Sequence, residues 1–475
     1  MTVATQPPVI EPDKTTPSET GAAQPTKPKS TRPHNVPFNR RPKVVIIGGG
    51  FAGLSAAKTL RHADMDITVI DRTNHFVFQP LLYQVAMAAL APSDIVAPIR
   101  AILRSQKNTQ VILGEVNKID PDSKSVFVKV DDEPREISYD YLILTTGAKH
   151  SYFGHNEWEE HAPGLKTIGD AQEIRQRFLI AFERAESAAD PEERRRWMTF
   201  VIVGGGPTGC ELAGVMPDIA RRVLRQDFRH IDVNDTRAIL VEAGPRILPT
   251  FPEDLAARAQ KDLESFGVEI RTGDPVTAID DEAVTLKSGE RIETHTTFWA
   301  AGNAASPLAK DLGAPLDRAG RVQVNPDLSV PGHPEVFVAG DLAAVTQKNG
   351  KPVPGVAQGA IQGGRRAAQN IAAINQDKPT VPFTYWDKGN LAVLGRTRAI
   401  ADLNFVHVGG FTAWAIWLFI HILYLVGFRN RLSVLLQWGY AFFTRQLGAR
   451  LIEEREQRSL GMTTQASANA SPWNG

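Results

Sequence analysis

One segment near the start of the chain combines three glycines and an acid in a pattern that binds a dinucleotide. The segment is Gly48-x-Gly50-x-x-Gly53, and Asp71 follows 18 positions after its last glycine. The first glycine permits a tight turn, the second lets the backbone approach a pyrophosphate, and the third lets helix and strand pack closely. Free N–H groups at the start of the following helix then bind the phosphates, and the acid binds ribose hydroxyls.

A second copy of the pattern lies about 155 residues further along the chain. It reads Gly204-x-Gly206-x-x-Gly209, and Glu242 ends the next run of aliphatic residues. A carboxylate at this position pairs with the ribose 2′-hydroxyl of NADH and repels the additional phosphate of NADPH. The second copy therefore favours NADH.

Two arginines close to Glu242 weaken that preference. Arg237 and Arg246 lie within a few positions of the acid and could attract the phosphate of NADPH. NADPH thus stays open. Two dinucleotide sites in one chain nevertheless indicate a flavin that exchanges electrons with a nicotinamide.

A third pattern is a pair of glutamines, Gln358 and Gln362. They are four positions apart, so a helix would place both on one face. Amide groups can hydrogen-bond the carbonyls of a quinone without carrying charge into an apolar site. Small neighbours such as Gly359 and Ala360 would let a flat ring approach. A plain polar helix face is the alternative interpretation.

The sequence offers few residues for other chemistry. Cys210 is the only cysteine, which excludes an internal disulfide, an iron–sulfur cluster and a cysteine-rich zinc site. The histidines at 75, 155 and 161 lack metal-ligand spacing, so no metal site is expected. Lys+Arg and Asp+Glu balance at 53 each, which argues against a nucleic-acid partner.

The elements that must position these residues alternate between strand and helix. Residues 43–47 and 67–71 form β-branched runs around a helical pattern at 51–62, and 200–203 and 238–242 repeat this arrangement. Further buried strands end at Gly147, Gly302 and Gly340. This order predicts an α/β fold with two Rossmann-like domains.

The C-terminal part changes character. Residues 411–428 are almost uniformly apolar and would span about 27 Å as a helix, close to the minimum for crossing a bilayer. Residues 432–452 instead suit an amphipathic helix at an interface. Trp414, Trp417, Tyr424 and Trp438 suit the headgroup level, and Arg429, Arg431, Arg445 and Arg450 suit anionic lipids. Monotopic attachment is favoured over a spanning helix, and the same surface could serve a homodimer.

Several segments together resemble a known family. The glycine turns, residues 145–148 and residues 339–341 resemble the two-dinucleotide-domain flavoproteins, with their glutathione-reductase-like layout. Residues 75–84, 204–211 and 356–362 are similar to the type II NADH:quinone oxidoreductases, a resemblance that covers about 43–452. Disulfide reductases and sulfide:quinone reductases need cysteine pairs that this chain lacks.

The resemblance implies roles for individual residues. The first unit would hold FAD, the second NADH, and Asp341 would contact the ribityl chain of the flavin. Glu211 would lie beside flavin and nicotinamide, although a carboxylate there could simply balance the helix dipole. Gln358, Gln362 and Lys388 would lie near a membrane quinone. The complete set of expected cofactor-binding residues is Gly48, Gly50, Phe51, Ala52, Gly53, Asp71, Gly147, Gly204, Gly206, Gly209, Glu242, Gly302, Gly340 and Asp341.

The predicted organisation has five parts. Disordered tails occupy 1–40 and 461–475, an FAD-binding domain 41–160 and 311–380, an NADH-binding domain 161–310, and a membrane-anchoring region 381–460. The expected function is electron transfer from NADH through FAD to quinone without proton pumping, at the cytoplasmic face of the cell membrane. A soluble NAD(P)H-dependent reductase of ferredoxin or a similar carrier, and an NADH-sensing flavoprotein, are the alternatives.

Overall fold

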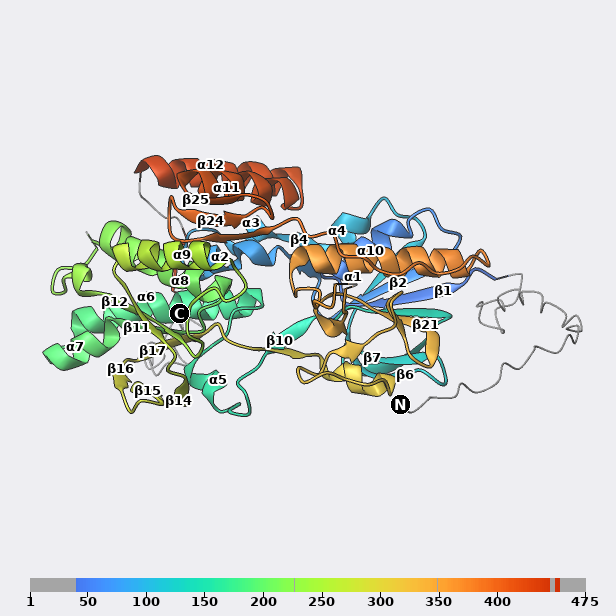
Figure 1. Ribbon diagram of the computed structural model, residues 1–475, viewed down its shortest axis with the longest axis horizontal. Coiled ribbons are helices and arrows are strands. Elements are labelled where there is room, and N and C mark those ends of the chain that lie inside the picture. The colour runs from blue at the N-terminus through green and yellow to red at the C-terminus, as the bar shows by residue number, and fades with distance from the viewer. Residues whose placement is uncertain (1–39, 226, 348, 445–448, 453–475) are drawn as a thin grey trace, which may run out of the picture.

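The computed structural model describes residues 40–225, 227–347, 349–444 and 449–452, so the tails predicted at 1–40 and 461–475 fall almost entirely outside it. Two parallel sheets, each covered by helices, confirm the predicted α/β fold. They lie side by side along the long axis of the molecule (Figure 1).

The first sheet carries the first glycine turn. Its strands are β1 (Lys43–Ile47), β2 (Asp66–Asp71), β5 (Thr109–Leu113), β9 (Tyr141–Leu144), β20 (Ser329–Val330) and β21 (His333–Val338). The order is β20-β21-β9-β1-β2-β5, and all neighbours are parallel except β20 and β21. Central β1 is buried from Val44 onward, because branched aliphatic residues suit a strand covered on both faces.

Two helices from distant parts of the chain cover one face of this sheet. They are α1 (Phe51–Thr59) and α10 (Ala357–Ile374). A Cβ atom at Gly364 would lie 2.1 Å from the carbonyl oxygen of Ala52, so only glycine allows this approach. The close packing holds the start of α10, with its glutamines, beside the first glycine turn.

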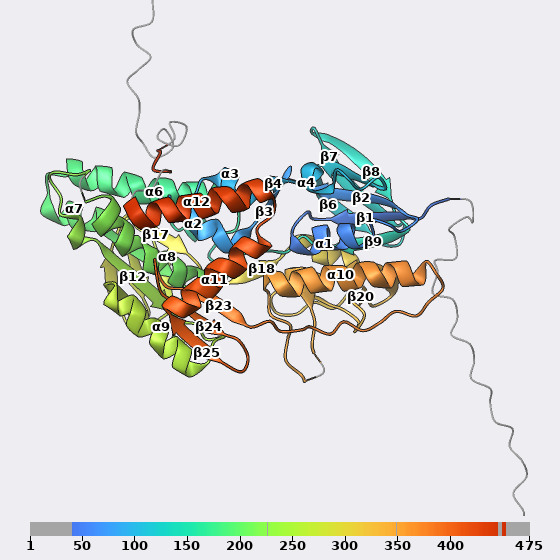
Figure 2. The ribbon, with the colours of Figure 1, turned by 90° about the horizontal axis from the view of Figure 1, so that it is seen from above.

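A small antiparallel sheet covers the opposite face of the first sheet. Its strands are β6 (Glu115–Asp120), β7 (Ser125–Val130) and β8 (Glu133–Ser138). The short elements of this half are β3 (His75–Val77), η1 (Gln79–Leu81), β4 (Val96–Pro98), α4 (Ile99–Leu103), η4 (Pro307–Leu312), β19 (Val322–Gln323), η5 (Gly340–Leu342) and β22 (Ala343–Ala344). Between η1 and β4 the chain reaches over to the second half, where α2 (Leu82–Ala86) packs against α6 (Ile168–Ser187) and α3 (Pro92–Ile95) packs against α12 (Phe428–Thr444) (Figure 2).

The second sheet repeats the plan. Parallel strands β11 (Thr199–Val203), β12 (Arg237–Glu242), β13 (Val268–Thr272) and β17 (Thr296–Trp299) run in the order β13-β12-β11-β17. The helices of this half are α5 (Trp158–His161), α6 (Ile168–Ser187), α7 (Pro191–Trp197), α8 (Pro207–Asp218), η2 (Ile219–Val223, a π-helix), η3 (Val233–Asp235) and α9 (Glu253–Ser265).

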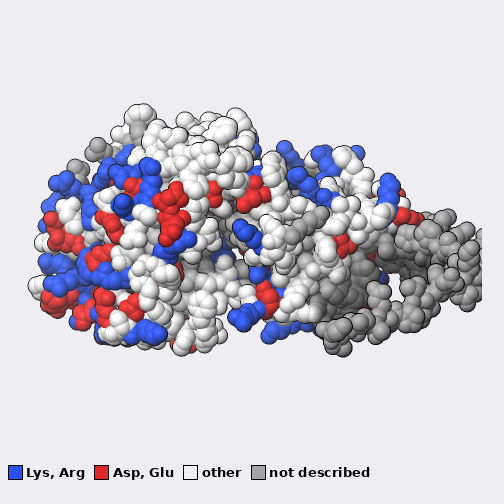
Figure 3. Space-filling view, in the orientation of Figure 1, with Lys and Arg blue, Asp and Glu red and all other residues white. Residues whose placement is uncertain are grey.

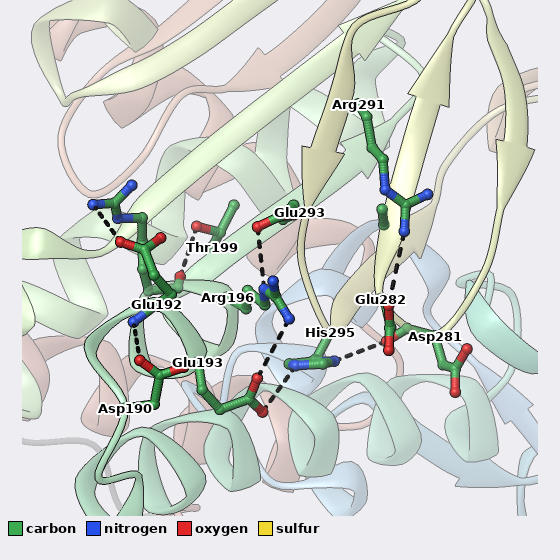
Figure 4. A network of polar contacts seen from close by, with 12 residues as sticks. Asp190, Glu192, Glu193, Arg196, Thr199, Asp281, Glu282, Arg291, Glu293 and His295 are labelled. Carbon is green, nitrogen blue, oxygen red and sulfur yellow. Dashed lines mark hydrogen bonds and ion pairs between the residues drawn. The ribbon is translucent and has the colours of Figure 1, made fainter.

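A polar network closes the far end of the second half. It joins α7 to the antiparallel strands β14 (Val276–Ile279), β15 (Ala283–Leu286) and β16 (Arg291–Glu293). Arg196 pairs with Glu293 at 3.1 Å, and His295 lies 3.0 Å from Glu193 (Figure 4).

An antiparallel ribbon is one of the connections between the two halves. Strand β10 (Ala148–His150) pairs with β18 (Asn303–Ala305), directly after Gly147 and Gly302. The strands of the first sheet come from 43–144 and 329–338, and those of the second from 199–299. The exact domain boundaries stay a prediction.

The C-terminal region adds a small sheet and two helices. Strands β23 (Asn390–Val393), β24 (Ala399–Asp402) and β25 (His407–Gly410) lead into α11 (Phe411–Tyr424) and α12 (Phe428–Thr444). Both helices lie over the second half (Figures 1 and 2). A turn at Gly427, with φ +90°, interrupts the apolar run at 411–428. Within the described ranges, no helix has the length and apolar character needed to cross a membrane.

Candidate active site

The first glycine turn has the shape of a pyrophosphate cradle. Gly48 adopts φ +101°, which allows the tight bend after β1. A Cβ at Gly53 would lie 1.8 Å from the Gly48 carbonyl oxygen, whereas one at Gly50 would meet nothing within 4 Å. The turn is thus closed where strand and helix meet and open where α1 presents its first N–H groups, beginning at Phe51 and Ala52. The residues fit a dinucleotide phosphate.

The second turn reproduces these features. Gly204 adopts φ +111°, a Cβ at Gly209 would lie 1.9 Å from the Gly204 carbonyl oxygen, and one at Gly206 would meet nothing within 4 Å. Helix α8 begins at Pro207, which lacks an N–H and suits the first helical turn. The chain therefore contains two built phosphate cradles.

The acid of each unit also organises its own turn, which the sequence did not reveal. Asp71 accepts a hydrogen bond from the Gly49 N–H at 2.6 Å, and Glu242 accepts one from the Gly205 N–H at 2.6 Å. The second oxygen of Glu242 accepts from the Gly244 N–H at 2.6 Å. The signal was available in principle, because parallel neighbouring strands end at the same edge of a sheet.

The two arginines near Glu242 are already engaged. Arg237 forms a two-pronged ion pair with Glu269 at 2.8 and 3.0 Å. Arg246 donates to the backbone carbonyls of Leu248 and Phe251 at 3.2 and 3.1 Å. Both guanidinium groups thus have partners within the protein, and Arg237 lies at the opposite end of β12 from Glu242.

The strand-end glycines all have positive φ, but only Gly147 leaves open space, because a Cβ at Gly302 would lie 2.7 Å from the Phe153 ring. Gly147, Gly302 and Gly340 have φ of +68°, +70° and +77°. A Cβ at Gly147 would meet nothing within 4 Å, so the backbone there is open to a ligand. Asp341 follows Gly340 in the short helix η5, half-buried and close to the start of α10.

Glu211 lies in the first half of α8, beside the backbone of Val393. Its surroundings desolvate the carboxyl group and raise its pKa to about 8, although a hydrogen bond from the backbone of Val393 opposes this. A carboxyl group with such a pKa can hold a proton near neutral pH. Tyr83 is buried close enough for Glu211 to raise the pKa of its hydroxyl further. Cys210 is fully buried, and burial raises the pKa of its thiol, as expected of a packing residue.

The two glutamines of α10 have different partners. The Gln362 amide donates to the Trp386 carbonyl at 3.0 Å and accepts from the Trp386 N–H at 2.9 Å. Gln362 therefore fixes the segment that follows α10. The Gln358 side chain reaches the Tyr424 hydroxyl instead. The structure thus brings Gln358, and not the whole pair, to a group that can exchange protons.

Tyr424, Lys388 and Gln358 form what we call the quinone cluster. The Lys388 ammonium lies 3.0 Å from the Tyr424 hydroxyl and 5.2 Å from the centre of the Trp386 ring. The hydrogen bond from Lys388 lowers the pKa of Tyr424. The sequence indicated Lys388, whereas Tyr424 was assigned only to the headgroup level. Its spacing from Lys388 gave no signal, because the contact forms through tertiary folding.

Helix α12 presents its polar side to the protein. Buried Asp94 accepts hydrogen bonds from Ser433 and Gln437 at 2.9 Å each. Trp438 donates to Gln84 at 2.7 Å. We call these contacts the polar latch. A surface helix usually turns its polar side to water, so α12 is inverted.

The outward surface formed by α11 and α12 is apolar. Exposed fractions reach 66% for Phe419, 81% for Phe428, 65% for Leu436 and 83% for Phe443. Figure 3 shows the region over these helices largely free of charged side chains. Contiguous apolar surface of this kind marks an interaction with a membrane or a protein. We call it the apolar face.

Comparisons with known proteins agree with this geometry. Residues 42–364 match the family described as pyridine nucleotide-disulphide oxidoreductase, and residues 386–446 match the NDH2 C-terminal domain. The type II NADH:quinone oxidoreductase Ndh of Mycobacterium tuberculosis is 46% identical, covering 88% of this chain and 91% of its own. NdhA of the same organism, which carries the same description, is 48% identical over 87% and 89%.

Solved structures share the fold. NDH2 from Plasmodium falciparum in complex with NADH matches with a TM-score of 0.80 at 20% identity, covering 87% of this chain and 100% of that one. The sulfide:quinone oxidoreductase from Aquifex aeolicus matches with a TM-score of 0.65 at 20% identity, covering 85% and 96%.

Proposed function

Because the chain belongs to the type II NADH:quinone oxidoreductases, we propose that quinone is reduced at the quinone cluster and that the apolar face rests on lipid. The family reaction moves two electrons from NADH through FAD to a quinone without pumping protons. This sets aside the soluble carrier reductase and the NADH sensor as the chain's activity. The main support for the proposal is that one chain contains both the quinone cluster and two glycine turns, each hydrogen-bonded to a carboxylate at the end of the neighbouring strand.

The first glycine turn holds FAD and the second holds NADH. Gly48, Gly50 and Gly53 receive the pyrophosphate of FAD, with Asp71 on its ribose and Asp341 on its ribityl chain. Both oxygens of Glu242 accept backbone hydrogen bonds, from Gly205 and Gly244, and each oxygen has a second lone pair that can accept from the NADH ribose. When bound, the flavin accepts a hydride from NADH and passes two electrons to quinone. Glu211 orients the nicotinamide with a carboxyl group that burial keeps largely protonated at neutral pH.

The quinone cluster supplies one of the protons that the quinone needs. Reduction to the quinol takes up two electrons and two protons, one at each oxygen, and the oxygen that faces away from the cluster takes its proton from water. The Gln358 amide donates a hydrogen bond to a quinone carbonyl, and the Tyr424 hydroxyl gives that oxygen a proton. Lys388 stabilises the phenolate that remains and returns a proton to it. Gln362 acts indirectly as a positioning residue, because its hydrogen bond to Trp386 holds that ring beside Lys388.

The apolar face supports attachment to a lipid surface. An inverted α12 leaves its large apolar side chains outward, where water would solvate them poorly and hydrocarbon would accept them. Lying in the interface, the face holds the quinone cluster near the level at which a lipid-soluble quinone diffuses. We place the enzyme at the cytoplasmic face of the membrane, since a single cysteine suits a reducing compartment. A homodimer formed through the same face is the competing proposal.

One spectroscopic cycle tests the route of the electrons. Purified FAD-loaded protein should lose its flavin absorbance on adding NADH and regain it on adding quinone, whereas ferredoxin should not restore it. Flotation with vesicles tests the membrane surface in parallel. Leu436→Ser with Phe443→Ser should release the protein from vesicles, while Leu113→Ser, which changes an exposed leucine elsewhere, should not. The competing proposal would be favoured if the native protein formed a stable dimer in lipid-free buffer and the double variant Leu436→Ser/Phe443→Ser were monomeric.

A further inference from the structure

An apolar cavity lies apart from the quinone cluster. It measures about 130 Å³ and separates the second half of the molecule from the C-terminal helices. Its walls are Val215 and Val223 on one side and Trp414, Trp417, Trp438 and Ala441 on the other. Ten positions of α11 separate Trp414 from Tyr424, which corresponds to about 15 Å. The reaction proposed above leaves this cavity unused.

The charged groups at the cavity are already paired. Asp218 and Arg222 form an ion pair at 2.8 Å, and Arg396 donates to the Ala441 carbonyl at 2.9 Å. Asp218 and Arg222 therefore neutralise each other, and the Arg396 guanidinium is bound to the backbone of α12. The remaining walls are mainly aromatic and aliphatic, so the chemistry that fits is neutral and apolar.

The cavity is large enough for an apolar ligand to stabilise it by filling it. Protein interiors are packed as densely as organic crystals, and an apolar void forfeits contacts on every side. An engineered apolar cavity of about 150 Å³ stays dry and binds benzene. A space of about 130 Å³ can thus accept a few carbon atoms of a chain or one small ring.

The two helices that line the cavity also form the apolar face. We propose that the cavity binds the end of a hydrocarbon chain from a membrane lipid, reaching inward past α11 and α12. This rests on the proposed lipid attachment. The walls on α8 and η2 belong to the second half, so a bound chain joins that half to the C-terminal helices through contacts that water cannot replace.

One wall of the cavity leads to Glu211. Trp438 donates to Gln84 at 2.7 Å, and Gln84 donates to the Tyr83 hydroxyl at 2.8 Å. Tyr83 in turn is close enough to feel the charge of Glu211. Trp438, Gln84 and Tyr83 all line the cavity, so the chain end packs against the groups that support the proposed hydride-transfer site.

Photocrosslinking tests the proposal with the full FAD-loaded protein. The probe is phosphatidylcholine with a diazirine at the end of one acyl chain, placed in vesicles and activated by light. We expect adducts on residues 215–223 in addition to the outward residues of α11 and α12. Ala441→Leu and Val223→Phe fill the cavity from opposite walls and should reduce the adducts on 215–223 by about tenfold. Ala415→Leu adds the same volume on the exposed side of α11 and should leave them unchanged.

The outcomes separate the cavity from the membrane surface. Adducts confined to the apolar face would overturn the cavity proposal and leave lipid attachment standing. Absence of adducts everywhere would overturn lipid attachment, and the cavity proposal with it. Labelling of 215–223 by a quinone with a diazirine at the end of its tail, but not by the phospholipid, would assign the cavity to the quinone and contradict the proposal. A melting curve for each filled variant shows that it is folded.

Discussion

The ammonium group of Lys388 lies 3.0 Å from the hydroxyl oxygen of Tyr424 and ties the segment after α10 to the last turn of α11. The contact matters chemically because it lowers the pKa of a phenol that is otherwise a poor proton donor near neutral pH. It also brings a lysine that the family resemblance indicated together with a tyrosine that the sequence linked only to the membrane surface.

Replacing Tyr424 with phenylalanine removes the proposed proton donor and keeps the ring. We expect flavin reoxidation by quinone to slow by about tenfold, because water can reach this site and partly substitute for the hydroxyl. Flavin reduction by NADH should be unchanged in the same stopped-flow experiment. Lys388→Met should raise the pKa of Tyr424 and move the alkaline limb of the reoxidation rate to higher pH. Equal slowing of both half-reactions in Tyr424→Phe would contradict the assignment.

The two glutamines of α10 should behave differently when each is changed to alanine. Gln358→Ala should slow flavin reoxidation and leave the melting temperature unchanged. Gln362→Ala breaks both hydrogen bonds to the Trp386 backbone, at a cost of about 1 kcal/mol for each. It should therefore increase proteolysis within 378–390 as well as slow reoxidation. Identical proteolysis of Gln358→Ala and Gln362→Ala would show that the hydrogen bonds from Gln362 to Trp386 do not stabilise the segment after α10.

Glu242 should matter for the first half-reaction only. Glu242→Ala removes the ribose ligand and frees the N–H groups of Gly205 and Gly244, so we expect the Kd for NADH to rise by about 10- to 100-fold. Reoxidation of prereduced flavin should keep its rate. Titration of NADH followed by stopped-flow mixing measures both. Glu269→Ala, which frees Arg237 from its ion pair at the opposite end of β12 from Glu242, serves as a control and should leave the Kd for NADH unchanged.

The raised pKa of Glu211 should make the stability of the folded protein depend on pH. Its folded pKa of about 8 exceeds the ordinary value of 4.5, so the folded state binds the proton more tightly than the unfolded state. The resulting stabilisation is complete below about pH 4.5 and is lost as pH rises through 8. Between pH 5 and 9 the melting temperature should therefore fall by about 3 °C more in the native protein than in Glu211→Gln. The exposed Glu253→Gln serves as a control, and it should follow the native curve.

The polar latch should control the docking of α12. Asp94→Ala leaves Ser433 and Gln437 without their acceptor and should lower the free energy of opening α12 by about 3 kcal/mol, measured by hydrogen exchange. Ser433→Ala removes one of the two bonds and should cost about 1 kcal/mol. Amides of α9 serve as an internal reference. Unchanged protection of α12 in Asp94→Ala would mean that apolar packing alone holds the helix.

The structural features that the sequence predicted are those that depend on local spacing. The two glycine turns, their acids and the strands before them follow from residues within one βαβ unit, and all appear where expected. The hydrogen bonds from Asp71 to Gly49 and from Glu242 to Gly205 depend on strand order, which composition leaves open. Gln362 was grouped with Gln358 because both lie on one helix face. Its bonds to Trp386 depend on where a loop returns, and helical spacing carries no information about that.

The C-terminal helices show the same limit. The alternation of polar and apolar residues in α12 correctly indicated two different faces. It could not indicate which face meets the protein, because the acceptor Asp94 lies 339 positions away from Ser433 in sequence. The apolar run at 411–428 was long enough to suggest a span by hydropathy, but Gly427 divides it.

The inverted α12 also decides how a detergent-free version of this enzyme can be prepared. Cutting the chain before Phe428 would remove Ser433 and Gln437, which donate to Asp94, and Trp438, which donates to Gln84. Residues 84–94 would then lose the helix that packs over them. Hydrophilic replacements confined to the outward positions avoid this damage. The C-terminal helices are thus part of the enzyme's scaffold, and truncation would cost activity.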